Sequence, residues 1–197
     1  MISSRKLLDD YLVDLAAERP GSPHLRIFDF DDTLAMTNSK VKLVAADGSQ
    51  RDLTPVEYCA YVPKEGERLS FEDFERLVDA RPVWWTCEIM RQAYMRHGPC
   101  GIVVLSARHI AGPIQQFINS QGVFDCHVAA VGSSDPEAKV TQIDAWIDAL
   151  GLQTVEYFED SDRHVSAVAG MRLRHPDVRF LIRHVKHDDV STLMRLR

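Results

Sequence analysis

The chain has 197 residues, of which 45% are hydrophobic and 26% charged, with a formal net charge of −6. This length suits one domain, or one domain with a small insertion, and can bury a full core. No apolar run reaches the roughly 18 residues that span a bilayer, and the first ten residues turn acidic where a signal peptide would be apolar. The composition therefore excludes an integral membrane protein and predicts a cytoplasmic one.

The spacing of the cysteines and the uneven distribution of charge along the chain are further features of the composition. The four cysteines lack the close pairing of a zinc site, and we interpret them as reduced thiols. From residue 163 onward, eight Lys or Arg residues stand against three acids, a balance of +5. This segment either helps to hold an anion or is an ordinary solvated surface, because its charge density is far below that of nucleic-acid-binding arms.

The first half of the chain alternates helix, strand and hairpin signals. Leucines at helical spacing predict an amphipathic helix over 5–18. An apolar run predicts a strand over 24–30. Two further short strands, at 41–44 and 51–53, flank an Asp-Gly turn, which is typical of a hairpin.

The segment after the hairpin predicts short helices. Residues 54–57 combine a Thr cap with Pro in the first turn, residues 70–73 resemble a capping box, and 83–97 suggests a third helix. We expect a flap and a small helical insert at about 38–98 within a single domain over 1–197.

From residue 101 the pattern becomes a regular alternation of strand and helix. This order predicts an α/β fold with a doubly wound, Rossmann-like parallel sheet and right-handed crossovers. The expected strands are 102–105, 127–131, 155–158 and 178–185, and the expected helices are 112–121, 136–150 and 161–169.

Acidic residues gather at the end of the first predicted core strand. Asp29 and Asp31 follow the apolar run, with Asp32 and Thr33 behind them. Ligands of open α/β sheets bind beyond the carboxyl ends of the strands. Because burying unpaired carboxylates costs several kcal/mol or shifts their pKa values, these acids predict a cation or phosphate site.

Later strands also end in polar residues. Ser106 and Arg108 follow the second core strand, Lys139 lies in the first turn of a helix after the third, and Glu159 with Asp160 ends the fourth. Together with Asp-x-Asp-x-Thr at 29–33, these segments resemble, in order, the four motifs of the haloacid dehalogenase (HAD) superfamily. The resemblance implies a HAD core over 24 to about 185.

This resemblance implies phosphoryl transfer through a covalent intermediate. Asp29 would attack phosphorus to form an aspartyl-phosphate, and Asp31 would protonate the leaving group and then deprotonate the attacking water. Ser106 would hydrogen-bond the phosphoryl group, and Lys139 would neutralise it and the nucleophile. The dehalogenase branch is excluded because it has no use for the acid at Asp31.

The same resemblance implies a Mg²⁺ cofactor, a hard cation that prefers oxygen ligands. Its expected ligands are the Asp29 carboxylate, the Asp31 backbone carbonyl and Asp160. Glu159 is expected to hold a metal-bound water or Lys139. Thr33 is expected to order the loop beside the substrate.

Substrate choice is open at this point. We expect Arg108 near the site mouth, where its guanidinium could bind a substrate phosphate in bidentate fashion. Ser106-x-Arg108 and Glu159-Asp160 resemble the 3'-phosphatase domain of polynucleotide kinases, and the flap with its insert resembles stand-alone HAD-like proteins of phages. The aromatic residues Trp84, Trp85 and Tyr94 could stack a nucleobase or belong to the core.

The leading hypothesis is a Mg²⁺-dependent phosphomonoesterase acting on a nucleotide, a nucleic-acid end or another small phosphate ester. One alternative is a polynucleotide 3'-phosphatase. The alternative from another class is a receiver-like or interaction module that binds phosphate and Mg²⁺ without turnover. The intact pair of Asp29 and Asp31 favours the enzyme.

Overall fold

The structure of the protein is a computed structural model that describes residues 8, 13, 15 and 23–186. Most of the helix predicted over 5–18 lies outside these residues. Among the described residues, no helix is both long enough and apolar enough to cross a membrane.

A five-stranded parallel sheet forms the centre of the molecule, in the order β10-β9-β1-β7-β8. The core strands expected from the sequence are confirmed to within two residues at each end. Their apolar runs suit a sheet that is covered on both faces. The strands are β1 (His24–Phe28), β7 (Ile102–Ser106), β8 (His127–Ala130), β9 (Thr154–Glu159) and β10 (Arg179–His184).

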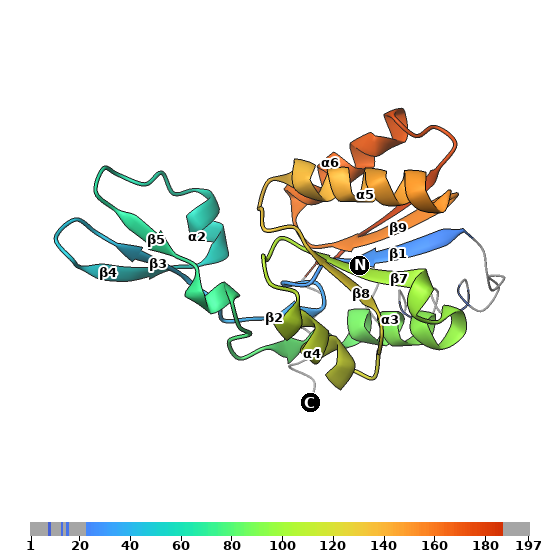
Figure 1. Ribbon diagram of the computed structural model, residues 1–197, viewed down its shortest axis with the longest axis horizontal. Helices are drawn as coiled ribbons and strands as arrows, with labels where there is room; N and C mark the ends of the chain where they lie inside the picture. The colour runs from blue at the N-terminus through green and yellow to red at the C-terminus, as the bar shows by residue number, and fades with distance from the viewer. Residues whose placement is uncertain (1–7, 9–12, 14, 16–22, 187–197) are drawn as a thin grey trace.

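Helices cover both faces of the sheet. In Figure 1, α5 (Pro136–Leu150) and α6 (Asp162–Gly170) lie above it, and α3 (Trp84–His97) and α4 (Gly112–Ser120) lie below it. The buried strand residues fall into two clusters because successive side chains point to opposite faces. Ile27, Leu105 and Tyr157 belong to the cluster with α5 and α6, whereas Phe28, Val104 and Phe158 belong to the cluster with α3 and α4. The α/β fold is therefore confirmed, and it is compatible with a Rossmann-like arrangement.

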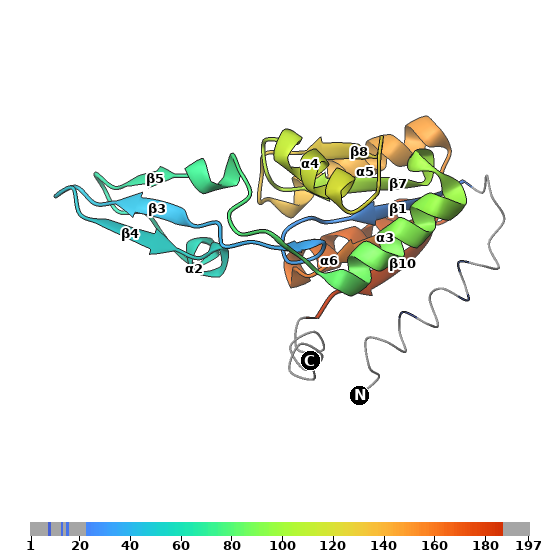
Figure 2. The ribbon, with the colours of Figure 1, turned by 90° about the horizontal axis from the view of Figure 1, so that it is seen from below.

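An insertion between β1 and α3 forms a separate lobe, visible in both Figure 1 and Figure 2. Its antiparallel sheet has the order β4-β3-β5 and packs a small core around Val41, Leu43 and Leu53. The predicted hairpin is confirmed, and so is the helix after it, which has a complete capping box. The elements are β3 (Val41–Val44), β4 (Gln50–Leu53), α2 (Pro55–Cys59), β5 (Arg68–Ser70) and the 3₁₀ helix η1 (Glu72–Phe74).

One of the three helices that we expected in the insert, the one at residues 70–73, does not form. Ser70 does not begin a helix, because it ends β5 and pairs there with Lys42 of β3. Only the single turn η1 follows it. The helix expected over 83–97 is α3, which packs in the main core through Ile89 and Met90. The antiparallel pair β2 (Ala35–Met36) and β6 (Arg81–Pro82) connects the lobe to the core; the two remaining 3₁₀ helices are η2 (Pro99–Gly101) and η3 (Met171–Leu173).

The chain segments that follow the neighbouring strands β1 and β9 run to opposite faces of the sheet. The chain after β1 leads to α3 below the sheet, and the chain after β9 leads to α6 above it (Figure 1). The two strands end together, with Phe28 paired to Phe158. Such a switch point is where open α/β sheets bind ligands.

Candidate active site

Asp29 lies at the carboxyl end of β1 and is buried. Its backbone N–H donates to the carbonyl oxygen of Phe158 at 2.9 Å, so the pairing with β9 continues to this residue. Lys139 lies in the first turn of α5, which Asp135 caps by accepting from the N–H of Glu137. The Lys139 Nζ donates to Asp29 Oδ1 at 2.5 Å. Two residues that the sequence separates by 110 positions are therefore in contact, as predicted.

Glu159 is the second buried carboxylate that contacts Lys139, at 2.8 Å. It also accepts from the Tyr157 hydroxyl at 2.5 Å and from the backbone N–H of Ser161 at 3.1 Å, and the Nδ1 of His164 lies 3.4 Å away. Burial opposes ionisation of Glu159, but Lys139 and these donors outweigh it and lower its pKa to about 2. Burial likewise opposes the charge on Lys139, yet the two carboxylates raise its pKa to about 12.

Asp160 completes a group of three acids with Asp29 and Glu159, whose nearest oxygens all lie within 4.8 Å of one another. Burial, and then the charges of Glu159 and Asp32, raise the pKa of Asp160 to about 7. Burial and Glu159 also raise the pKa of Asp29 well above its usual value. One lysine does not balance three carboxylates, so this group could hold a cation, and its all-oxygen donors suit a hard one.

Thr33 and Ser106 support the carboxylates from buried positions. The Thr33 hydroxyl donates to Asp160 Oδ1 at 3.3 Å, and the Thr33 carbonyl accepts from Thr86 at the start of α3. Thr33 therefore orders the loop, and because it is fully buried the structure offers no support for a direct contact with substrate. Ser106 ends β7, and its Oγ accepts from the N–H of Arg108 at 3.1 Å. Because Ser106 Oγ is the acceptor in that bond, its hydroxyl hydrogen remains available to a second group.

Asp31 and Arg108 form a bidentate ion pair. The Arg108 Nε donates to Asp31 Oδ2 and its Nη2 donates to Asp31 Oδ1, both at 2.8 Å. The Thr37 hydroxyl also donates to Asp31 Oδ1, at 3.0 Å, so the Asp31 carboxylate accepts three hydrogen bonds. The expectation of an exposed guanidinium at the site mouth is wrong, because Arg108 is only 4% exposed.

Several residues that contact the candidate site residues were not predicted from the sequence. Tyr157 could have been found, because it is two positions before Glu159 on the same strand and so shares its face of the sheet. Ser39 and Thr37 carry no such signal, since they contact Arg108 across about 70 positions of sequence. Trp85 is mostly buried in the core, whereas Trp84 is 40% exposed.

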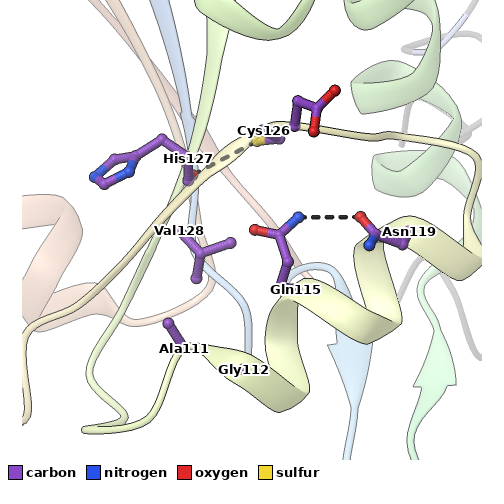
Figure 3. A pocket seen from close by; sticks show the side chains of 8 residues that line it. Ala111, Gly112, Gln115, Asn119, Cys126, His127 and Val128 are labelled. Carbon is purple, nitrogen blue, oxygen red and sulfur yellow. Dashed lines mark hydrogen bonds between the residues drawn. The ribbon is translucent and has the colours of Figure 1, made fainter.

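A groove of about 530 Å³ lies elsewhere, between α4 and the edge strand β8. Figure 3 shows Gln115 and Asn119 on α4 along one side, with Val128 and the backbone of β8 opposite. None of the three clustered acids lines it, so this groove is separate from the carboxylate group at the ends of β1 and β9.

Comparison of the chain with protein-family models, with curated proteins and with solved structures finds no match.

Proposed function

We propose that this protein is a HAD-type, Mg²⁺-dependent phosphomonoesterase that acts on a nucleotide, a nucleic-acid end or another small phosphate ester. The observation that carries the proposal is the carboxylate of Asp29 at the switch point, held by the buried Lys139 within a group of three acids. The second acid, Asp31, lies two residues further on. The resemblance of the four strand ends to the HAD motifs supports this assignment.

In this proposal, the contact between Lys139 and Asp29 Oδ1 fixes the orientation of the nucleophile, and Oδ2 attacks phosphorus. The new Asp29 oxygen–phosphorus bond forms as the ester phosphorus–oxygen bond breaks, and the leaving oxygen takes a proton from Asp31. Water then attacks the phosphorus of the aspartyl-phosphate while Asp31 takes a proton from that water. The Asp29 oxygen–phosphorus bond breaks, so that inorganic phosphate leaves and the Asp29 carboxylate is regenerated. The Ser106 hydroxyl donates a hydrogen bond to the phosphoryl group.

The carboxylates of Asp29 and Asp160 and the backbone carbonyl of Asp31 are the groups that would hold Mg²⁺. Glu159 is left out of this set because it already accepts from Lys139, Tyr157 and Ser161. The cation would neutralise the negative charge that otherwise repels a carboxylate from a phosphate. The raised pKa values of Asp29 and Asp160 support this choice, since these two groups lack sufficient positive charge in the protein alone.

The test is hydrolysis of an aryl phosphate, of nucleoside monophosphates and of 3'-phosphorylated oligonucleotides, each with and without Mg²⁺. We expect turnover that Asp29→Asn abolishes, because the amide is nearly isosteric but cannot attack phosphorus. Asp177→Asn is the matched control, since Asp177 is an exposed turn residue.

Residual activity of Asp29→Asn within about tenfold of wild type, a barrier difference of only ~1.4 kcal/mol, would contradict the assignment. Absence of turnover in wild type on every substrate would favour the receiver-like or interaction module. A preference for the oligonucleotides over mononucleotides would identify the 3'-phosphatase alternative.

A further inference from the structure

The side chain of Arg108 is buried, whereas the side chain of its ion-pair partner Asp31 is partly exposed. The exposed fractions are 2% for Arg108 and 32% for Asp31. Beyond the two bonds to Asp31, Nη2 donates to Ser39 Oγ at 3.0 Å, and Nη1 donates to the carbonyl oxygens of Phe74 at 3.2 Å and Arg76 at 2.9 Å. Every nitrogen of the guanidinium therefore has a partner within the protein.

The partners of Arg108 come from two parts of the molecule. Arg108 follows β7 of the core and Asp31 follows β1, whereas Phe74 and Arg76 lie at the base of the inserted lobe. The ring of Phe74 also packs over the guanidinium, 5.0 Å from its carbon. The base of the insert therefore holds Arg108 in one orientation, and Arg108 in turn holds Asp31.

Two parallel N–H···O bonds fix the plane of a carboxylate as well as its position. A group that transfers protons must lie within about 2.6–3.2 Å of the atom that it serves, and a misplacement of 1 Å can cost about a hundredfold in rate. Arg108 cannot reach a substrate without breaking its buried bonds, but the partly exposed Asp31 can.

We propose that Arg108 is a positioning residue, which orients Asp31 for proton transfer and is itself held by the base of the insert. This inference rests on the proposed phosphatase function, and it gives Arg108 a role other than binding the substrate.

A double-mutant cycle tests it, with Arg108→Lys, Asp31→Asn and the double variant. Lysine keeps the charge but cannot make the bidentate pair. We expect Arg108→Lys to lower kcat by about a hundredfold on an alkyl phosphate with little change in KM. In the Asp31→Asn background, the same substitution should cost less than about twofold, because residues that act through one another are not additive.

The reaction with an activated aryl phosphate supplies a second readout. Its leaving group departs without an acid, so the variants should still form the aspartyl-phosphate but hydrolyse it slowly. Both Arg108→Lys and Asp31→Asn should therefore release a burst of about one aryl alcohol per active site before a slow steady state. Arg68→Ala is the control and should keep wild-type rates, because Arg68 is an exposed residue of β5 in the inserted lobe and supplies no contact to Arg108 or Asp31.

The proposal would be overturned if the two substitutions lowered kcat independently, so that the loss in the double variant equalled the product of the two single losses. A rise in KM without a fall in kcat would also overturn it, and would place Arg108 on the substrate. Urea unfolding of the same four proteins gives a readout that needs no activity. The two substitutions should also be non-additive in unfolding, and additive effects there would show that the pair does not form. Absence of turnover in wild type alongside a coupled pair would refute the proposed function, and with it the positioning role, while leaving the ion pair established.

Discussion

The substitution Asp160→Asn should stabilise the metal-free protein at alkaline pH. Asp160 lies against Asp29 and Glu159, and these three acids have one buried lysine between them. Removing the Asp160 charge therefore relieves a repulsion and leaves the hydrogen bond from Thr33 available to the amide oxygen.

The magnitude follows from the pKa of Asp160, which folding raises from 3.8 to about 7. A group with a raised pKa contributes stability that is present below pH 3.8 and is lost as the pH rises through 7. At about 1.4 kcal/mol per pH unit, ionising Asp160 costs the fold on the order of 4 kcal/mol by pH 8. For a chain of this length, that corresponds to a difference in Tm of about 10 °C.

The assay is thermal unfolding in EDTA at pH 5 and pH 8, followed by circular dichroism. We expect the Asp160→Asn variant to exceed wild type in Tm at pH 8 and to gain less than half as much at pH 5, because the penalty accumulates from pH 3.8 to about 7 and is still small there. Asp177→Asn removes one exposed negative charge and controls for the net charge of the protein. Saturating Mg²⁺ should raise the Tm of wild type and leave that of Asp160→Asn nearly unchanged.

An equal Tm for Asp160→Asn and wild type at pH 8 would refute the electrostatic argument. A difference in Tm of the same size at both pH values would also refute it, because a difference that does not depend on pH cannot arise from the ionisation of Asp160. A Mg²⁺ response that persists in the variant would remove Asp160 from the metal ligands.

Two further predictions concern the same carboxylates. Lys139→Met should destabilise the protein by about 3–5 kcal/mol, measured by urea unfolding, because it leaves Asp29 and Glu159 buried without their cation; a loss below ~1 kcal/mol would mean that water already screens the pair. EDTA should abolish phosphatase activity and Mg²⁺ should restore it, whereas Ca²⁺ should bind and support little turnover, because its looser coordination admits a second oxygen of Asp29 and withholds it from attack. Full activity of metal-free protein would contradict this metal site.

The convergence of Asp29 with the Glu159-Asp160 pair could be predicted from topology. These acids lie at or just after the carboxyl ends of two predicted parallel strands, and those ends meet at one edge of a sheet. The place of Lys139 beside them, from the first turn of a helix, was expected only because its segment resembles the third HAD motif.

The insert was predicted less well because local signals there compete with long-range pairing. Ser70-Phe71-Glu72-Asp73 has the spacing of a capping box, but Ser70 pairs with Lys42 across 28 positions and stays extended. A strand of three residues, such as β5, has too few positions to show an alternation. The sequence therefore favoured helix where the structure has sheet.

The environment of Arg108 was not predictable for a related reason. Two of its acceptors are backbone carbonyls, of Phe74 and Arg76, and any residue could supply them. The sequence shows a cation two positions after Ser106, which suits a phosphate ligand as well as a partner for Asp31. Only the fold of the insert distinguishes the two, because it buries the guanidinium.

Glu159 shows how the structure resolves an alternative that the sequence left open. The sequence allowed it to hold either a metal-bound water or Lys139, and the structure places it against Lys139. A carboxylate has about four lone-pair sites, and Lys139, Tyr157 and Ser161 already donate to three of them. In the proposed reaction Glu159 would therefore act through Lys139, because it helps to keep the ammonium charged and directed at Asp29. Asp160, by contrast, has the oxygen atoms and the unbalanced charge that a cation would satisfy.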